Sequence, residues 1–378
     1  MEENPETKTK LMNKGHTDLI NEVVEGGLCV YCGACAGGCP YLTAYKGRIV
    51  VMDNCDREDG QCYQFCPRTF TDMDFLSNKF FGEPFGANEI GFSRNLLLAK
   101  AADARIHERG QDGGVVTALL TVAIEEGLID AAIVAKMDEE KVPNGFVART
   151  REQLLECARN SYEPCPTLQE LNGLPYDSTE KLGIVSLPCH SAALSKMKAY
   201  KTRNRVNLEN VNLIIGLFCG WTLAEGFHGY LQDNFDLKNI VKFDIPHSPG
   251  HTYDAYYKDG TKKEVELEDI RKYINPACDY CWDMTAEFSD VSVGSGRSKY
   301  KGWNTLIPRT GTGEKLVELA MEKGVLETKP LPEENIMNLK KACLNKKKSA
   351  VRKLSKKYNG DLGYLGISHT LKEKLLSD

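Results

Sequence analysis

The stretch Cys29-Val30-Tyr31-Cys32-Gly33-Ala34-Cys35-Ala36-Gly37-Gly38-Cys39-Pro40 fits the spacing C-x2-C-x2-C-x3-C-P without a gap. Three thiolates that are two residues apart can bind three corners of one [4Fe–4S] cubane, and the fourth points away to a second cluster. The glycines within the run let the backbone approach the inorganic core closely. Zinc sites rarely hold four cysteines this close together. The run therefore predicts a ferredoxin-like module that binds [4Fe–4S] clusters.

The next cysteines supply the end of a second such motif, which is incomplete. Cys62 and Cys66-Pro67 repeat the C-x3-C-P ending, but an unbroken repeat would have cysteines where Asp56 and Asp59 stand. Two clusters then have the ligand sets Cys29, Cys32, Cys35 and Cys66, and Cys39, Cys55 and Cys62. The second set is one thiolate short, so an aspartate, a water or a distant cysteine would complete it. We expect two clusters, and the alternative is a single one.

Another pair of cysteines with ligand spacing lies far along the chain. Cys278-Asp-Tyr-Cys281 is a C-x2-C that follows Asn275-Pro276. We expect this pair to be metal ligands that reach the cysteine-rich head from the rest of the protein. The alternative is a pair of buried thiols, because free cysteines are commonly core residues.

The composition suits metal or redox chemistry better than secretion or nucleic-acid binding. Seven of the 14 cysteines lie between Cys29 and Cys66, which does not suit a disulfide framework. The net charge of −5 argues against a nucleic-acid partner. No apolar stretch approaches the ~20 residues that span a bilayer, and the polar first residues lack the apolar centre of a signal peptide. We expect a cytoplasmic protein with no transmembrane segment.

The residues after about position 90 alternate between short apolar strands and helices. Strands are predicted at 131–136, 182–187 and 211–218, and each leads into a helical segment or follows one. Such alternation indicates an α/β fold with a largely parallel sheet, whose ligand sites lie at the carboxyl ends of the strands. Cys189 and Cys219 follow two of these strands and are candidates for lining a site. His190 is a candidate proton donor or cofactor contact, or else a helix cap.

A glycine-rich turn precedes the first helix of this region. It consists of Gln111, Asp112, Gly113, Gly114, Val115, Val116 and Thr117. Two glycines at a helix start let ligand oxygens approach free backbone N–H groups, where the helix dipole favours an anion such as a dinucleotide pyrophosphate. The alternative is a plain tight turn.

The last third of the chain has a different pattern. Short alternating strands at 238–247, 251–259 and 261–269 surround Asp259-Gly260, which predicts a type I′ hairpin. A strand at 288–294 leads into a glycine-punctuated basic loop, in which Arg297 and Lys301 are candidate contacts for an anionic cofactor or substrate tail. The alternative is a solvated basic loop.

The order of these motifs along the chain resembles a known family. The motifs are the head with its ending Cys62 to Arg68, Asp112-Gly-Gly-Val-Val-Thr-Ala-Leu-Leu, Asn160-Ser-Tyr-Glu-Pro, Pro188-Cys189, Leu217-Phe-Cys-Gly, the Cys278 and Cys281 pair with Asp283, and Ser289-Asp-Val-Ser-Val-Gly. From about residue 25 to 350 the chain resembles the beta-subunit family of coenzyme F-420-reducing hydrogenases and dehydrogenases. His190 departs from the family pattern, which has glutamine after Pro-Cys.

The resemblance implies FAD bound by the α/β body, with contacts from the turn Gln111 to Thr117. It also implies hydride exchange with coenzyme F-420 as substrate, and iron–sulfur clusters that connect FAD to a catalytic partner subunit. That partner would be a formate dehydrogenase, a hydrogenase or a heterodisulfide reductase-type complex. F-420 exchanges electrons in pairs and a cluster singly, so a flavin has to lie between them. The alternatives are a reductase of this fold for another two-electron substrate, or a flavin-free electron-transfer scaffold.

We therefore expect a flavin-binding α/β (mixed α+β) body with an N-terminal ferredoxin-like module. The expected divisions are an N-terminal extension (1–24), an iron–sulfur domain (25–85), an FAD-binding domain (90–235), a mixed C-terminal part of the same body (236–330) and a Lys-rich helical tail (331–378). The tail has an amphipathic pattern typical of a solvated helix or one that docks a partner.

Overall fold

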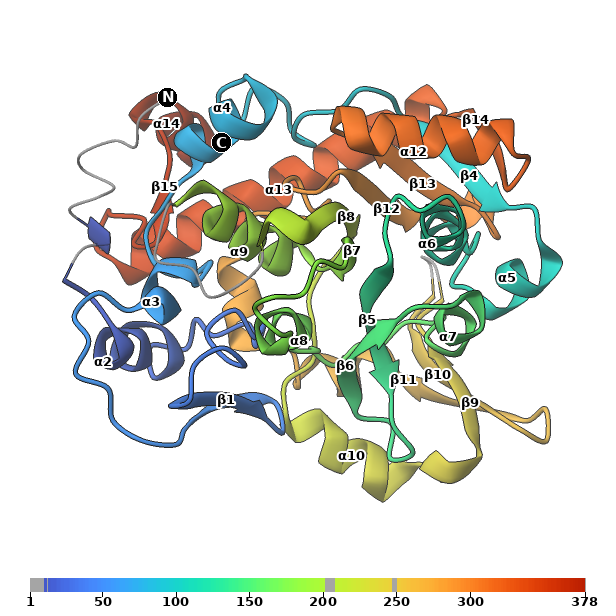
Figure 1. The fold of residues 1–378 in the computed structure, drawn as a ribbon, viewed down its shortest axis with the longest axis horizontal. Helices are drawn as coiled ribbons and strands as arrows, with labels where there is room; N and C mark the ends of the chain where they lie inside the picture. Colours follow the sequence, from blue (N-terminus) through green and yellow to red (C-terminus); the bar gives the residue numbers. More distant parts are fainter. Residues whose placement is uncertain (1–9, 12, 201–207, 247–249, 378) are drawn as a thin grey trace.

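A computed structural model describes residues 10–11, 13–200, 208–246 and 250–377 of the chain. Its largest element is a mixed sheet of eight strands (Figure 1). In sheet order the strands are β14 (Leu326–Pro330), β4 (Leu97–Ala101), β13 (Asn304–Pro308), β12 (Val291–Ser295), β8 (Val211–Leu217), β7 (Leu182–Ser186), β5 (Ala131–Met137) and β6 (Pro143–Ala148). The predicted α/β class is confirmed.

The sheet is parallel only at its centre. Strands β12, β8, β7 and β5 run parallel, and the outer strands pair antiparallel with their neighbours. The reason is the length of the connections. Short links of five and eight residues join β5 to β6 and β12 to β13, and such links reverse the chain, whereas the parallel strands are joined by longer crossovers that contain helices.

Helices cover both faces of the sheet, because successive residues of its central strands point into two different cores. Val134 and Ile215 belong to one core, and Ile133 and Ile214 belong to the other. The first core is covered by α5 (Ala104–Arg109), α6 (Val115–Glu125), α7 (Arg151–Glu156) and α12 (Gly311–Glu322). The second is covered by α8 (Thr167–Gly173) and α9 (Pro188–Ala199).

A smaller sheet forms a separate layer with its own aromatic core. It consists of β9 (Ile240–Asp244), β10 (Thr252–Tyr257) and β11 (Lys262–Glu266), and it packs with α10 (Gly226–Asn234) and α11 (Leu267–Arg271). The hairpin at Asp259-Gly260 forms as predicted, but the type I′ turn is wrong. That turn needs positive φ at two successive residues, and only Gly260 has it, at 83°. The Asp259 carboxylate instead accepts hydrogen bonds from the Thr261 amide at 2.9 Å and its hydroxyl at 2.6 Å.

The cysteine-rich head shares one core with the C-terminal helices. Its elements are α2 (His16–Leu19), a π-helix (Ile20–Val24), β1 (Leu42–Tyr45), β2 (Arg48–Val51), α3 (Gln61–Phe65), β3 (Thr71–Asp72) and α4 (Met73–Phe81). They pack with α13 (Glu333–Lys357), β15 (Leu365–Gly366) and α14 (His369–Leu376).

Helix α13 connects the head to the large sheet, as its length in Figure 1 shows. Ala350 and Leu354 belong to the head core, whereas Leu339 and Cys343 pack against Ile307 of β13. The Lys-rich tail is therefore not a solvated helix on all sides, because one face is buried and holds two parts of the protein together. Within the described ranges, no helix is both long and apolar enough to cross a bilayer.

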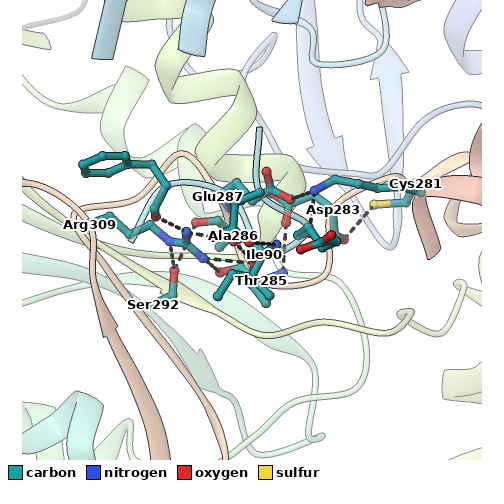
Figure 2. A network of polar contacts seen from close by, with 12 residues as sticks. Ile90, Cys281, Asp283, Thr285, Ala286, Glu287, Ser292 and Arg309 are labelled. Carbon is teal, nitrogen blue, oxygen red and sulfur yellow. Dashed lines mark hydrogen bonds and ion pairs between the residues drawn. The ribbon is translucent and has the colours of Figure 1, made fainter. Parts of the chain in front are cut away.

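A buried polar network lies where α13 meets the loop before β12 (Figure 2). The Arg309 guanidinium donates to the Ser292 hydroxyl at 2.6 Å and to the Ile90 carbonyl at 3.0 Å. Lys347 forms a short ion pair with Glu287, and both side chains are almost fully buried. Burial raises the pKa of Glu287 to about 7, although nearby Lys347 opposes the rise. The loop is thus fixed by charges that compensate one another inside the protein.

Lys347→Met leaves Glu287 buried without its cation and is expected to lower the free energy of unfolding by about 3–5 kcal/mol near pH 8. Since the folded state then holds the Glu287 proton more tightly than the unfolded state, the loss should shrink as the pH falls to about 5. Denaturant unfolding followed by tryptophan fluorescence measures both effects. The control is Lys347→Met with Glu287→Gln, which should recover most of the stability. An equal loss in both variants would contradict this role for the ion pair.

Candidate functional site

The first cysteine site consists of the four residues that the sequence assigns to one cluster: Cys29, Cys32, Cys35 and Cys66. The thiol of Cys66 lies close enough to the other three to raise their pKa values. Burial is the larger cause in each case, and it raises the pKa of Cys29 to about 11. These thiols stay protonated at neutral pH unless a metal takes the place of the proton.

The second cysteine site consists of Cys39, Cys55 and Cys62. Burial raises the pKa of Cys62 to about 12, and Cys39 and Cys55 contribute further to the rise. Cys62 also interacts with Cys35 and Cys66, so the second site lies beside the first. Asp56 and Asp59, which stand where an unbroken repeat would have cysteines, are both exposed.

The third cysteine site consists of Cys189, Cys219, Cys278 and Cys281, and it was not predicted as a unit. Cys189 interacts with Cys281 and Cys219, and Cys219 interacts with Cys278 and Cys281. Burial raises the pKa of Cys219 to about 12. The sequence predicted that Cys278 and Cys281 reach the head as ligands. Their segment does contact the head, since Asn275 donates to the Cys29 carbonyl at 3.3 Å, but the two thiols lie with the strand-end cysteines. One sequence feature could have predicted this grouping. Cys189 and Cys219 each follow a parallel strand, and the carboxyl ends of such strands meet at one edge of the sheet.

The local structure explains how the third site is held. Cys189 is the second residue of α9, directly after β7 and Pro188. Cys278 lies in a 3₁₀-helix (Pro276–Tyr280). Asn275 caps this helix, because its side-chain oxygen accepts a hydrogen bond from the Ala277 amide at 2.9 Å. The Thr222 amide nitrogen lies 3.4 Å from the Cys278 sulfur. The four sulfurs therefore come from three separate segments that only the fold brings together.

The three sites form a series. Cys32 of the first site interacts with Cys189 of the third, and Cys35 of the first interacts with Cys62 of the second. In the part of the chain that the structure describes, no three His, Cys, Asp or Glu side chains are close enough to hold a single metal ion. Four thiols on a cubane each bind a different iron, so they lie farther apart than ligands of one ion. The donor sets of the first and third sites suit [4Fe–4S] clusters.

A cavity of about 520 Å³ opens at the carboxyl ends of the central strands. Most of the residues predicted to contact a cofactor line it, namely Gln111, Asp112, Gly114, Val115, Thr117 and Arg297. Cys219 and His190 line it as well. The glycine turn is fixed from two sides, because the Gln111 side chain donates to Asp244 at 2.7 Å and Gly114 has a left-handed backbone with φ 69°.

Three predicted residues are not part of the cavity wall that surrounds the turn. Gly113 packs against the sheet, since a Cβ there would lie 2.8 Å from both the Ala99 carbonyl oxygen and Asn304 Oδ1. Lys301 is exposed outside the cavity. Cys189 belongs to the third cysteine site and does not line the cavity. The two glycines therefore have different roles: Gly113 allows close packing against the sheet, and Gly114 lines the cavity.

The sequence missed a whole segment of the wall, residues 157–163, although Asn160-Ser-Tyr-Glu-Pro stood out as a motif. Its role was not visible because the segment follows α7, whose position over the cavity depends on packing against α6. Arg159 from this segment and Arg297 both line the cavity and are exposed. Two cations at a cavity favour an anionic ligand.

Two polar atoms in the cavity wall are buried without a hydrogen-bond partner: Ser186 Oγ and His190 Nε2. The other ring nitrogen of His190 lies 2.9 Å from the Thr167 hydroxyl. Burial lowers the pKa of His190 to about 4, so the ring is neutral at physiological pH. Buried polar groups are normally satisfied, so these atoms indicate a polar ligand group in the cavity. The glycine turn, the two arginines and these atoms fit a flavin dinucleotide.

An α/β sheet with a large cavity at its strand ends, and with buried thiols gathered directly behind the cavity, is typical of a cofactor-binding redox protein. Residues 96–172 match the N-terminal part, and residues 179–334 the C-terminal part, of the coenzyme F-420 hydrogenase/dehydrogenase beta subunit family. The chain belongs to this family. The match spans both the glycine turn and the third cysteine site.

Individual relatives agree with this assignment. The chain is 30% identical over 279 residues to the coenzyme F-420 hydrogenase subunit beta of Methanothermobacter thermautotrophicus, covering 70% of this chain and 95% of that protein. It is 32% identical over 347 residues to the coenzyme F-420-dependent sulfite reductase of Methanocaldococcus jannaschii, covering 85% of this chain but 51% of that protein. A chain of the F-420-reducing [NiFe] hydrogenase complex from Methanosarcina barkeri superposes with a TM-score of 0.65 at 28% identity, covering 72% of this chain and 97% of that chain.

Replacing Cys278 and Cys281 together by serine is expected to remove one cluster, about one third of the iron and acid-labile sulfide if all three sites are filled. The measurement is iron and sulfide per chain in protein purified without oxygen. Cys343→Ser is the matched control, because the buried Cys343 lies outside the three sites and the cavity, so its replacement should leave the iron content unchanged. Unchanged iron in the double variant would show that the third site holds no cluster.

Ser186→Leu places an apolar side chain in the cavity and is expected to reduce the flavin per chain at least tenfold. Ser186→Ala removes the same hydroxyl without filling space, so its flavin content should stay within a few-fold of the wild type. Flavin released by acid and measured by absorbance tests both variants. Flavin at the wild-type level in both variants would mean that the cavity is not the flavin site.

Proposed function

We propose that the chain is an oxidoreductase subunit that moves hydride between coenzyme F-420 and bound FAD, and single electrons through [4Fe–4S] clusters to or from a catalytic partner. One observation carries the proposal: Cys219 is part of the third cysteine site and also lines the cavity. A ligand in the cavity and a cluster on the thiols would therefore be neighbours. The names of the relatives, an F-420 hydrogenase subunit and an F-420-dependent sulfite reductase, support the choice of substrate.

Different residues of the cavity would bind different parts of FAD. The start of α6, where the helix dipole favours phosphate, lines the cavity with Val116 and Thr117. The amides of Gly114 and Val115 instead fix the turn, because they donate to the Gln111 carbonyl and to Asn304 Oδ1, each at 3.3 Å. Arg159 and Arg297 supply positive charge for anionic groups. Ser186 and His190 offer the polar atoms that lack partners. When bound, a flavin exchanges a hydride with a two-electron carrier and single electrons with a cluster.

In this proposal the cysteine sites provide a path for electrons between the cavity and the partner. The third site lies at the cavity, the first site follows through Cys32 and Cys189, and the second site follows through Cys35 and Cys62. We propose a cluster in each, which is one more than the sequence predicted. The head then acts as a ferredoxin-like module (residues 25–85), and the α/β body (90–330) acts as the flavin-binding unit, in a cytoplasmic complex.

The partner would be a formate dehydrogenase, a hydrogenase or a heterodisulfide reductase-type complex. The hydrogenase complex of Methanosarcina barkeri contains a chain of this fold, which supports a partner of the hydrogenase type. None of the cavity residues has to act as a nucleophile in this proposal, because the bound groups carry the electrons.

The direct test mixes protein purified without oxygen, reduced F-420 and a one-electron viologen dye. We expect the deazaflavin absorbance band of oxidised F-420 to appear while about two dye molecules are reduced for each F-420, since a hydride carries two electrons. The flavin-poor Ser186→Leu protein should be inactive, and Cys343→Ser, which lies outside the cavity and the three cysteine sites, should be active.

The outcome also separates the alternatives. If F-420 gives no reaction but a nicotinamide donor reduces the dye, the chain acts on another two-electron substrate. If the protein contains full iron but no flavin, it is an electron-transfer scaffold. Either result would overturn the proposed substrate while leaving the cluster assignment in place.

A further inference from the structure

Arg68 lies inside the protein between two of the cysteine sites. It follows Cys66-Pro67, and 4% of its surface is exposed. Its guanidinium donates to the Tyr280 carbonyl at 3.1 Å, to the Ala277 carbonyl at 3.4 Å and, in a short contact, to the Tyr364 hydroxyl. Its Nε has no partner. All of these acceptors are neutral, because burial raises the pKa of Tyr364 and keeps its hydroxyl protonated.

No carboxylate compensates this buried charge in the part of the chain that the structure describes. A buried cation without an anion is strongly unfavourable, and proteins normally pair it. Elsewhere in this protein a buried cation does have a carboxylate partner: in the network of Figure 2, Lys347 forms an ion pair with Glu287. Arg309 in that network is likewise close to Glu287 and Asp283. Arg68 has no counterpart of these acids, so its anion has to come from elsewhere.

The groups around Arg68 that can become negative are cysteine sulfurs of two sites. From the first site, the Arg68 amide nitrogen lies 3.4 Å from the Cys66 sulfur, and the Arg68 charge lowers the pKa of Cys29 and Cys66. Burial lowers the pKa of Arg68, whereas Tyr364 and then Cys281, Cys189 and Cys278 of the third site raise it. The guanidinium also donates to the Ala277 and Tyr280 carbonyls, which are next to Cys278 and Cys281 in the chain. One guanidinium therefore interacts with both thiol sets.

We propose that Arg68 is the counter-cation shared by the clusters of the first and third cysteine sites, and that it raises the reduction potentials of both. This inference rests on the proposed function, because it requires clusters at the two sites. A [4Fe–4S] cluster with four thiolates is an anion, and one-electron reduction adds one negative charge without forming or breaking a bond. A fixed cation nearby stabilises the reduced form more than the oxidised form. Arginine does not lose its proton in proteins, so the charge stays in place.

A second buried cation offers a comparison, because it belongs to one site only. Lys196 on α9 is fully buried, and its ammonium donates to the Cys66 carbonyl at 2.8 Å, the Thr69 hydroxyl at 2.8 Å and the Phe70 carbonyl at 2.9 Å. Among the cysteines, it interacts with Cys66 of the first site. Burial lowers the pKa of Lys196 to about 7, although Cys66 opposes the shift, so the comparison is made at about pH 6, where the side chain is mainly protonated. Its charge should then act on the first cluster and leave the third unaffected.

The test is a reductive titration of the full chain, purified without oxygen and followed by electron paramagnetic resonance. The signal of the third cluster is identified by its absence in the Cys278→Ser, Cys281→Ser double variant. In Arg68→Met the first and third clusters should both shift to more negative potential, and the second cluster should stay nearly unchanged. In Arg68→Lys the shifts should be smaller, because the charge is kept. In Lys196→Met only the first cluster should shift.

The possible results separate this inference from the proposed function. Arg68→Met with full iron and unshifted potentials would overturn it, as would a shift confined to one cluster. If Arg68→Met loses iron, Arg68→Lys decides. Retained iron with potentials near the wild type supports the role of the charge, and loss of iron in both variants overturns it. Wild-type protein without iron would instead refute the clusters themselves.

Discussion

The buried side chain of Lys196 joins the cysteine-rich head to the α/β body at the first cysteine site. Lys196 is fully buried on α9 and donates to three backbone carbonyls and one hydroxyl of the segment 66–70, directly after the last cysteine of the first site. The same helix begins with Cys189, which belongs to the third cysteine site, and His190, which lines the cavity. A single rigid element of 12 residues thus fixes the first site, the third site and the cavity relative to one another.

Burial is the common property of these sites, and it explains their chemistry. The thiols have raised pKa values mainly because they are removed from water, so in the absence of a metal they are inert. Two buried basic side chains, Arg68 and Lys196, lie near them, and burial lowers the pKa of Lys196 to about 7. The polar network around Glu287, in contrast, pairs its charges internally. When a cluster binds, the thiols become thiolates, and the negative charge of the cluster then compensates the buried positive charges that have no carboxylate partner. The electrostatic arrangement is coherent only for the loaded protein.

The cavity and the cysteine sites are connected through one short segment after β8. Phe218, Cys219 and Gly220 line the cavity, and Cys219 also belongs to the third site. Lys346 of α13 donates to the Cys219 and Gly220 carbonyls at 2.7 and 2.8 Å. The C-terminal helix therefore stabilises the junction between cavity and third site as well as the head core. This position explains why a segment with a solvated composition has a buried face.

The sequence alone determined the features that depend on local spacing. The cysteine run from Cys29 to Cys39 and the ending at Cys66 predicted which thiols gather at the first and second sites, because ligands close in sequence are held by one loop. The alternation of strands and helices predicted the central sheet, and the glycine turn before α6 predicted one wall of the cavity. The signal for each feature lies in a short stretch of chain, although the sheet itself pairs distant strands, such as β4 with β14.

Tertiary structure alone decided what depends on distant segments. Cys189, Cys219, Cys278 and Cys281 come from three places in the chain, and only the edge where parallel strands end brings them together. Folding likewise places Arg68 between two sites. It also leaves Lys301 outside the cavity, although a lysine could have bound an anionic ligand there. The physical reason is that burial and charge neighbours are properties of the packed fold. A sequence pattern identifies residues that can bind metal, and only packing determines which of them share a site.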